Sequence, residues 1–559
     1  MASGRQSERR LLLIAIAALI LYLPGLGRPA LWEPDEGRYA EIAREMYLTG
    51  DFVTPRDDFV RYFEKPPLVY WAESASIALF GIDEFAIRLP AALFSVGQVV
   101  VTAAIAAAMF GDAVAILAAI ALALSPLFFG FARFATLDPA LAFFMTAGLG
   151  AFLMASRAED FGVGVGRRWF LGCAAMLAFG TLAKGPVAPV LCGAVALIWM
   201  IMERRTREIV HIPWIPAIAV YLVIAVPWFA IAAYRNPDFL GFFFIHEHVH
   251  RFLEDTEHGW GLWFFIPIVI GGAWPWIYFV PMGVRVSSAD ESRRSAMRFL
   301  IIWFLVIFVF FSIPRAKLGS YILPAMPALA ILAALGIYRL WDIEARAASR
   351  IISGFALLTL LGAFAAAVAA VMVRNKMPPA LSRDAFLIAA ILAALGIAAF
   401  MVDRKGDRPG ALVMTLALGV LVLMGVASRA RNDAADLTSY RKLAKEAADH
   451  LHPGCVLGSY RHIVQSLPFY TGFREALVSY RGELAPFSDD PDAAESFIHN
   501  DDELRRRWSS NRCFMLIANR KDLPALATLT PAPVIVGCEG KKLALLNDPN
   551  APRDASCGP

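Results

Sequence analysis

The chain has 559 residues, of which 58% are hydrophobic and 18% are charged, and its formal net charge is +4. A soluble protein of this length usually carries more charge and fewer apolar residues. The small positive charge comes mainly from arginines between apolar blocks, which argues against a nucleic-acid partner and for a protein embedded in a lipid bilayer.

The apolar residues form uninterrupted blocks such as Leu11–Gly27 and Ala113–Gly130. Blocks of this length span a bilayer core of roughly 30 Å, and an α-helix satisfies its own backbone hydrogen bonds there. The sequence therefore predicts a polytopic α-helical membrane protein with about thirteen spans. Their approximate positions are 10–27, 86–109, 112–130, 139–156, 169–184, 186–203, 212–234, 260–281, 298–313, 320–340, 350–373, 384–402 and 410–427.

Basic clusters lie in every second connection, starting with "RQSERR" at the N-terminus. Lys and Arg are enriched in cytoplasmic loops, so the N-terminus is predicted to be cytoplasmic. The first block imitates a signal peptide, but no small-x-small cleavage site follows it, and we expect a retained span. With an odd number of spans, the tail lies outside. We thus predict a transmembrane domain, residues 1–428, which includes an outside loop at 28–84, and an outside domain, residues 429–559.

The first outside loop begins with "LWEPDEGRYAEIAREM", which places Asp35, Glu36 and Arg38 within four residues of one another. The stretch after Pro34 predicts an amphipathic helix that lies at the membrane interface, and the aromatic stretch around "KPPLVYW" predicts a second one. Asp35 either complements the dipole and caps the helix or belongs to a site between membrane and water. The polar face, which we expect to meet water, contains Arg38, Glu41, Arg44 and Glu45.

Further charged residues lie where spans are predicted to reach the outer face. Glu64 and Lys65 precede a double proline, which constrains the turn that presents them. Asp138, in "FARFATLDPA", lies at the outer end of a span together with Arg133, and carboxylates in that setting are usually functional or face a cavity. Each outside cation has an interfacial anchor as its alternative, but five on one face favour an anionic ligand; they are Lys65, Lys184, Arg251, Arg315 and Lys317.

The tail predicts a small α/β domain. Short strands are expected at Cys455–Tyr460 and Cys513–Asn519, and amphipathic helices at Thr438–Leu451 and Asp492–Trp508, which gives alternating strands and helices. The tail also has four cysteines, for which two disulfides allow three pairings; they are Cys455, Cys513, Cys538 and Cys557.

These pieces together resemble a known superfamily. The Asp35–Glu36 pair, "YFEKPPLVYW", "TLDP", "IHEHVHRF" and "PRAKLGSYILPAMPALAIL" are similar to the polyprenyl-phosphate glycosyltransferases of GT-C fold. The "EKPPL" and "KLGSYILPAMP" pieces most resemble the bacterial lipid A 4-amino-4-deoxy-L-arabinose transferases. The resemblance covers essentially all the spans and is weak in the tail.

The resemblance implies an inverting transfer of aminoarabinose from undecaprenyl phosphate to a lipid A phosphate at the periplasmic face of the bacterial inner membrane. This modification gives resistance to polymyxin and other cationic peptides. In the family's pattern, Asp35 matches the first-loop carboxylate with Glu36 beside it, Asp138 matches the second acidic position, and Lys65 matches a lysine near the donor phosphate.

The chemistry of this reaction assigns roles to the outside residues. The leaving phosphate gains negative charge as the glycosidic bond breaks, so nearby cations stabilise the transition state. Tyr321 could add a hydrogen bond to that phosphate, beside Lys65, Lys184, Arg251 and Lys317. A hydroxyl acceptor would need Asp35 as a base, whereas a phosphate acceptor would not, and Asp35 would then orient the acceptor, the sugar amine or Arg38.

Three alternatives stay open at this point. Glu64, His246 and His248 could hold a divalent metal, although histidines at i and i+2 do not share a helical face; local hydrogen bonding is the other interpretation. The acceptor could be a protein, as in protein O-mannosyltransferases, or another polyprenyl-phosphate-sugar reaction could apply. A transporter or flippase would show paired broken helices and charges near mid-span, whereas these charges gather at outer span ends.

Overall fold

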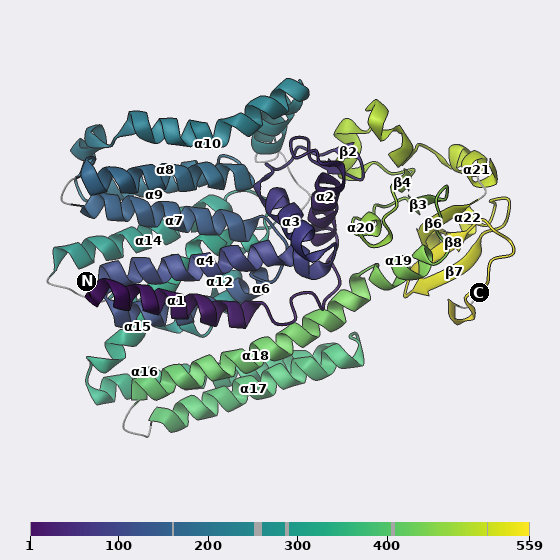
Figure 1. The fold of residues 1–559 in the computed structure, drawn as a ribbon. Coiled ribbons are helices and arrows are strands. Elements are labelled where there is room, and N and C mark those ends of the chain that lie inside the picture. The colour runs from purple at the N-terminus through teal and green to yellow at the C-terminus, as the bar shows by residue number, and fades with distance from the viewer. Residues whose placement is uncertain are drawn as a thin grey trace. The chain divides into compact units, whose positions relative to one another are not determined.

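The computed structural model describes residues 2–158, 161–250, 260–285, 290–403, 408–510 and 513–557 (Figure 1). The chain divides into two compact units. Unit 1 comprises Met1–Pro24 and Ala91–Ala430, and unit 2 comprises Gly25–Pro90 and Arg431–Pro559. The first outside loop thus belongs to the same unit as the tail, and the domain ranges given above stay a prediction.

Within the described residues, eight helices are long and apolar enough to cross a membrane. Two consecutive helical pieces, α12 (Phe265–Gly272) and Trp276–Val284, are bent by 98° relative to each other. If this pair forms one span, the number of candidate spans in the described residues is nine. Trp276–Val284 consists of η3 (Trp276–Phe279) and α13 (Val280–Val284). The eight are α4 (Glu84–Phe110), α7 (Asp138–Arg157), α10 (Trp214–Arg235), α14 (Glu291–Ser312), Gly319–Trp341 with α15 (Met326–Tyr338), α16 (Ala345–Val373), α17 (Pro379–Asp403) and α18 (Arg408–Thr438).

All thirteen predicted spans fall on helical segments, so the polytopic α-helical class is confirmed and the number of spans stays a prediction. The predicted span at 112–130 consists of two pieces, because Pro126 has no N–H and begins a new helix at its first turn. The remaining spans fall on α1 (Ala2–Tyr22), α5 (Asp112–Ala123) with α6 (Pro126–Phe131), α8 (Gly164–Lys184) and α9 (Val187–Met202).

The core of unit 1 surrounds α15, whose residues from Met326 to Ile337 are all buried. Gly336 of α15 and Gly283 of α13 allow a close approach of the two helices, because a Cβ at either position would overlap a carbonyl oxygen of the facing helix. Small residues at helix contacts are typical of membrane bundles, where packing rather than hydrophobicity holds helices together.

Unit 2 combines the first loop with the tail domain. The loop contains α2 (Asp35–Thr49), a hairpin of β1 (Arg56–Asp57) and β2 (Val60–Arg61), and α3 (Leu68–Phe80). The described tail contains a six-stranded sheet in the order β5-β4-β3-β6-β8-β7, in which β5, β4, β3 and β6 are parallel and β8 and β7 antiparallel. This sheet confirms the predicted α/β domain. Its strands are β3 (Val456–Tyr460), β4 (Glu475–Val478), β5 (Phe497–Ile498), β6 (Phe514–Asn519), β7 (Val534–Glu539) and β8 (Lys542–Leu546).

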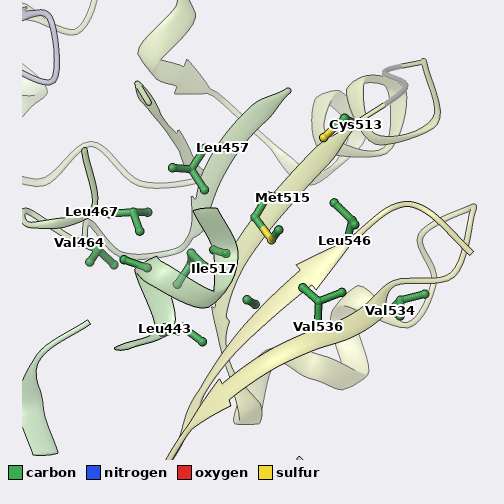
Figure 2. Close-up of a cluster of buried hydrophobic side chains, with 13 residues drawn as sticks. Leu443, Leu457, Val464, Leu467, Cys513, Met515, Ile517, Val534, Val536 and Leu546 are labelled. Atoms are coloured by element: carbon green, nitrogen blue, oxygen red, sulfur yellow. The ribbon is translucent and has the colours of Figure 1, made fainter. Parts of the chain in front are cut away.

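Both faces of the sheet are buried. Met515 and Ile517 of β6 face a cluster that includes Leu443 of α19 (Arg441–Ala448) and Leu467 of α20 (Leu467–Thr471) (Figure 2). The alternate β6 residues pack against Trp508 on the other side, as the two-residue period of a strand requires. In the described residues, disulfides join Cys455 to Cys513 and Cys538 to Cys557, which selects one of the three pairings that the sequence left open.

The predicted helix at Asp492–Trp508 is wrong in its first half. This stretch contains the 3-10 turn η7 (Pro491–Ser496), strand β5, and a helix, α21, that begins at Asp501 and ends at Ser510. Phe497 and Ile498 pair with β4 and are buried, so burial in the sheet outweighs the local helical pattern. The Asn500 side chain accepts a hydrogen bond from the Glu503 backbone N–H, which marks the true start of the helix.

The polar face of α2 is buried, although the sequence analysis expected it to meet water. Arg38, Glu41, Arg44 and Glu45 are 6%, 0%, 4% and 2% exposed. Arg44 donates two 2.7 Å hydrogen bonds to Glu41. Arg38 and Glu45 have partners in unit 2, described below. Gly37 lets the α2 backbone approach Gln465 and Ser466 of the tail, where a Cβ would lie 2.7 Å from a backbone nitrogen. The face is therefore a buried contact surface within unit 2.

Candidate functional site

The first group of site residues lies in unit 1 and is centred on an ion pair between Asp138 and Lys184. Asp138 is the first residue of α7 and Lys184 is the last residue of α8. Each charge therefore complements the dipole of its own helix end. The Lys184 ammonium also lies 4.4 Å from the centre of the Tyr321 ring. The structure thus brings together three of the residues that the sequence analysis selected.

Lys317 belongs to the same unit and precedes η4 (Gly319–Ala325), the segment that carries Tyr321. Lys317 is 3% exposed, and its Nζ donates a 2.9 Å hydrogen bond to the Trp260 carbonyl. Because an ammonium has three N–H donors, this bond leaves capacity for an anionic ligand. Arg133 instead donates to the Tyr22 carbonyl at 2.8 Å and lies over the Phe129 ring, so this arginine ties α1 to α6.

The second group lies in unit 2 around Arg38. Its guanidinium makes a 2.6 Å ion pair with Glu483 and a 3.5 Å hydrogen bond to the Tyr62 hydroxyl. Asp35, one helical turn earlier, lies 3.8 Å from the same guanidinium. Since the Arg38 side chain is only 7% exposed and the Asp35 side chain is 35% exposed, Asp35 is the member of the pair that solvent or a substrate reaches more easily.

The capping interpretation of Asp35 receives limited support. Asp35 is in the first turn of α2, where a negative charge is favourable. Pro34 occupies the N-cap position, and no side-chain capping hydrogen bond is formed there by the described residues. Glu36 reaches back instead and accepts a 3.0 Å hydrogen bond from the Trp32 backbone. In the described residues, Glu36 rather than Asp35 thus makes the hydrogen bond to the backbone that precedes the helix.

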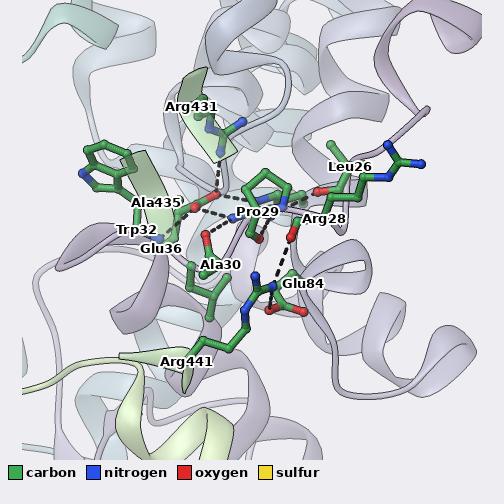
Figure 3. Close-up of polar contacts among 12 residues, drawn as sticks. Leu26, Arg28, Pro29, Ala30, Trp32, Glu36, Glu84, Arg431, Ala435 and Arg441 are labelled. Carbon is green, nitrogen blue, oxygen red and sulfur yellow. Dashed lines mark hydrogen bonds and ion pairs between the residues drawn. The ribbon is translucent and has the colours of Figure 1, made fainter. Parts of the chain in front are cut away.

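Glu36 is a structural residue in this arrangement. Its carboxylate has no exposed surface and accepts two hydrogen bonds, of 2.8 and 2.7 Å, from Arg88 of α4. Arg431 lies 3.6 Å from it (Figure 3). Arg88 also donates to the carbonyls of Leu26, Pro29 and Ala30. The pair therefore holds the start of the first loop, and we exclude Glu36 from the groups proposed to contact substrate.

Lys65 follows the hairpin and lies just before α3. Its side chain is 20% exposed, and its Nζ donates a 3.0 Å hydrogen bond to the Glu64 carbonyl and lies 3.8 Å from the Glu64 carboxylate. Pro67 forms the N-cap of α3, so the double proline turn presents Lys65 as the sequence analysis expected.

Several predicted ligands lie outside the described residues. Arg251 is one of them, as are the side chains of His246 and His248, although the helix η2 (Gly241–His250) includes both histidines. The metal site with Glu64 therefore stays a prediction. Two groups of metal-ligand type occur in the described residues. Their cysteines form the two disulfides, so these sulfurs are not thiolate ligands.

A set of buried carboxylates joins the first loop to the tail. The Asp58 carboxylate accepts a 2.8 Å hydrogen bond from the Glu475 backbone, and Glu45 accepts one from Phe59. Burial and the mutual repulsion of the carboxylates raise the pKa values of Asp58 and Glu475 well above their usual range. Burial also raises the pKa of Glu33 to about 7, although Ser466 donates to it at 3.0 Å.

Sequence reasoning missed Glu483, Tyr62 and Arg88. Glu483 lies more than 400 residues from its partner Arg38, and nothing in "RGELAPF" marks it. A signal existed for Arg88, because an arginine near the beginning of a predicted span needs a partner. That the five outside cations face one anionic ligand, as the sequence analysis expected, stays a prediction.

Comparisons with known proteins agree with the resemblance. The family model of dolichyl-phosphate-mannose-protein mannosyltransferase matches residues 8–243. The undecaprenyl phosphate-alpha-4-amino-4-deoxy-L-arabinose arabinosyl transferase of Yersinia enterocolitica is 33% identical over 324 residues, which is 58% of this chain and 58% of that protein. The corresponding protein of Enterobacter sp. is 33% identical over 331 residues, 59% of each. The matched region thus spans less than two thirds of these curated relatives.

Solved structures match along the whole chain. The crystal structure of ArnT from Cupriavidus metallidurans bound to undecaprenyl phosphate is 30% identical and has a TM-score of 0.85, and the match covers 97% of this chain and 99% of that one. The apo structure of the same protein gives a TM-score of 0.84 at 30% identity, with 98% and 100% covered.

Proposed function

Because the chain belongs to the ArnT family of glycosyltransferases of GT-C fold, we propose that it transfers 4-amino-4-deoxy-L-arabinose from undecaprenyl phosphate to a phosphate of lipid A. The observation that carries this proposal is the similarity along 97% of the chain to an ArnT structure that holds undecaprenyl phosphate. The names of the curated relatives support the same sugar and the same lipid carrier.

In the proposed reaction, an acceptor phosphate oxygen attacks the anomeric carbon of the sugar with inversion, and undecaprenyl phosphate leaves. Lys65, Lys184 and Lys317 stabilise the negative charge that grows on the leaving phosphate. Asp138 holds the Lys184 ammonium in place, so that its orientation is set before the substrate binds.

Asp35 serves a different purpose in this proposal. A lipid A phosphate is already an oxyanion near neutral pH, so the acceptor needs no base. The donor sugar, however, carries an ammonium group, and a partly exposed carboxylate beside it would favour that charge. We assign this recognition to Asp35, with Arg38 fixing its position from 3.8 Å.

The proposed location is the bacterial inner membrane, with the active site and the tail domain in the periplasm. Two disulfides in the described tail support this location, because disulfides persist in oxidising compartments such as the periplasm. In cells, the reaction would reduce the negative charge of the outer surface and lower the binding of cationic peptides such as polymyxin.

The test incubates the purified full-length chain with synthetic undecaprenyl-phosphate aminoarabinose and lipid A, and measures the mass of lipid A with and without a chelator. We expect modified lipid A from the wild type. We expect Asp35→Asn to lower the rate by a factor of at least about 100. Asp502→Asn, which changes a carboxylate that is 77% exposed in the tail, is the control. Unmodified lipid A with a folded wild-type chain would refute the proposal, and loss of activity with the chelator would support the predicted metal.

The match to the protein mannosyltransferase family model gives a second candidate acceptor, a protein hydroxyl. That acceptor would need a base, and Asp35 would supply it. The two proposals differ in the labelled product: in membranes given labelled donor, the protein acceptor predicts labelled protein instead of labelled lipid A.

A further inference from the structure

A cleft of about 230 Å³ opens at the carboxyl ends of the neighbouring parallel strands β4 and β5. Pockets for drug-sized ligands begin at about 300 Å³, so this cleft fits a single headgroup. Its lining residues are Ser479, Tyr480 and Arg481 after β4, and Phe497, Ile498 and His499 in and after β5.

The polar groups of the cleft suit an anionic sugar derivative. Arg481 donates to Ser488 at 3.0 Å, and it lies 3.3 Å from Asp489 and 3.3 Å from Nδ1 of His499. Since a guanidinium only donates, His499 Nδ1 accepts and the imidazole keeps its N–H on Nε2. The Asp489 side chain is 84% exposed, so water screens this pair and a phosphate can replace it with two parallel hydrogen bonds.

Tyr480 supplies an aromatic surface beside this cation. The Tyr480 side chain is 37% exposed, and its ring packs against Gly482, where a Cβ would lie 2.6 Å from a ring carbon. Gly482 has a φ of +49°, which a glycine adopts without strain. The glycine thus leaves room for the ring, which lines the cleft and on which a sugar ring could pack.

The chain segment that follows the cleft residue Arg481 contacts the candidate catalytic loop. Glu483 pairs with Arg38 at 2.6 Å, and Asp490 accepts two hydrogen bonds, of 2.5 and 2.6 Å, from Arg61 of β2. Between them, the Phe487 ring packs edge-on against Phe63 at 5.5 Å. A ligand that binds Arg481 is therefore held beside the segment whose Glu483 pairs with Arg38 next to Asp35.

We propose that the cleft at Tyr480, Arg481 and His499 binds a phosphorylated sugar headgroup of the acceptor lipid, as a second anchoring point beyond the reacting phosphate. This inference rests on the proposed function and names the part of the tail that recognises the acceptor. The donor lipid does not use this cleft.

The test compares steady-state kinetics of full-length wild type, Arg481→Gln and Arg505→Gln. Arg505 is a matched control, because it also pairs with an exposed aspartate of the tail and lies outside the cleft. We expect Arg481→Gln to raise the acceptor KM about tenfold, which is the effect of losing one charge-assisted pair, with kcat and the donor KM unchanged. Inorganic phosphate should raise the acceptor KM of the wild type more than that of Arg481→Gln.

An acceptor KM for Arg481→Gln equal to that of the wild type would overturn the inference while the wild type still transfers sugar. If the wild type transfers no sugar, the proposed function fails and the cleft is judged by binding alone. Calorimetric titration of glucosamine phosphate into the full-length chain should then give a signal with the wild type and Arg505→Gln, and none with Arg481→Gln. Equal signals from all three would contradict the site. Binding of inorganic phosphate as tight as that of glucosamine phosphate would assign the cleft to free phosphate and refute the lipid headgroup.

Discussion

At the residue scale, the ion pair between Lys184 and Asp138 joins two helix ends and lies beside Tyr321. A cation held this firmly reorganises little as charge develops on the leaving phosphate. The pair is the part of unit 1 whose geometry most directly suits a role in the reaction.

Lys184→Gln should lower the single-turnover rate about 100-fold, because loss of one fixed donor to a developing oxyanion costs that much. Lys184→Arg should recover part of the rate. The control is Lys445→Gln, which changes an exposed lysine of α19. A single-turnover rate for Lys184→Gln close to that of the wild type would remove Lys184 from the mechanism.

Glu36 and Arg88 illustrate the structural use of charge. Breaking a buried pair by removing one partner leaves an uncompensated charge, which costs about 3–5 kcal/mol. Arg88→Met should therefore lower the thermal unfolding temperature of the purified chain. Arg505→Met, at a position where the arginine is 52% exposed, should change it little. Equal unfolding temperatures of the two variants would show that the Glu36 contacts do not hold the loop.

At the element scale, the β1–β2 hairpin is one of the features that attach the first loop to the tail. Its turn residues Asp58 and Phe59 have positive φ values of 53° and 65°. The Asp58 carbonyl accepts a 2.8 Å hydrogen bond from Ser496, and Arg474 lies 4.9 Å from the Phe59 ring centre. The hairpin thus inserts into the tail with buried carboxylates on both sides, which makes the contact sensitive to pH.

Glu33, which accepts a hydrogen bond from the Ser466 backbone, provides a test of the pH sensitivity of the contact between the first loop and the tail. Burial raises its folded-state pKa to about 7, against the effects of the Ser466 hydrogen bonds and the charges of Lys542 and Arg38. A carboxyl with a raised pKa stabilises the folded state at low pH, and this contribution disappears as pH rises from about 4.5 to about 7. Thermal unfolding should show that stability falls between pH 5 and 8, by up to about 3 kcal/mol from this group.

Glu33→Gln keeps the acceptor for Ser466 and removes the titration. The variant should unfold at a higher temperature than the wild type at pH 8 and show a flatter pH dependence. Stability that rises with pH in the wild type, or a parallel curve for the variant, would contradict the buried-carboxylate account.

The polar face of α2 shows why an element can be located correctly and its environment mispredicted. The spacing of Tyr39, Ile42, Ala43 and Met46 correctly indicates a helix in the first loop. Its charged residues, however, find partners such as Glu483, which lies far along the chain. Amphipathicity alone cannot distinguish a face that meets water from one that meets complementary charges.

At the scale of the whole molecule, the features that depend on local sequence were predicted best. Apolar blocks located the helices because span length is set by bilayer thickness, and the strands around Leu457 and Met515 followed from short apolar runs between turns. The cysteine pairing and the strand at Phe497 depend on the tertiary arrangement of the sheet, so the sequence left the first open and misassigned the second. Among the site residues, Asp138, Lys184 and Tyr321 lie together while their roles stay a prediction, and Glu36 is buried against Arg88.

The central claim is that the predicted cations, among them Lys65, Lys184 and Lys317, act on the phosphate of the donor lipid. The direct test is photo-cross-linking of the full-length chain with an undecaprenyl phosphate analogue that carries its reactive group beside the phosphate, followed by peptide mass spectrometry. The account predicts labelled peptides from the Lys65 segment and from the segments of Lys184 and Lys317, all suppressed by unlabelled undecaprenyl phosphate. Labelling that misses the segments of Lys184 and Lys317, or that is insensitive to the competitor, would contradict it.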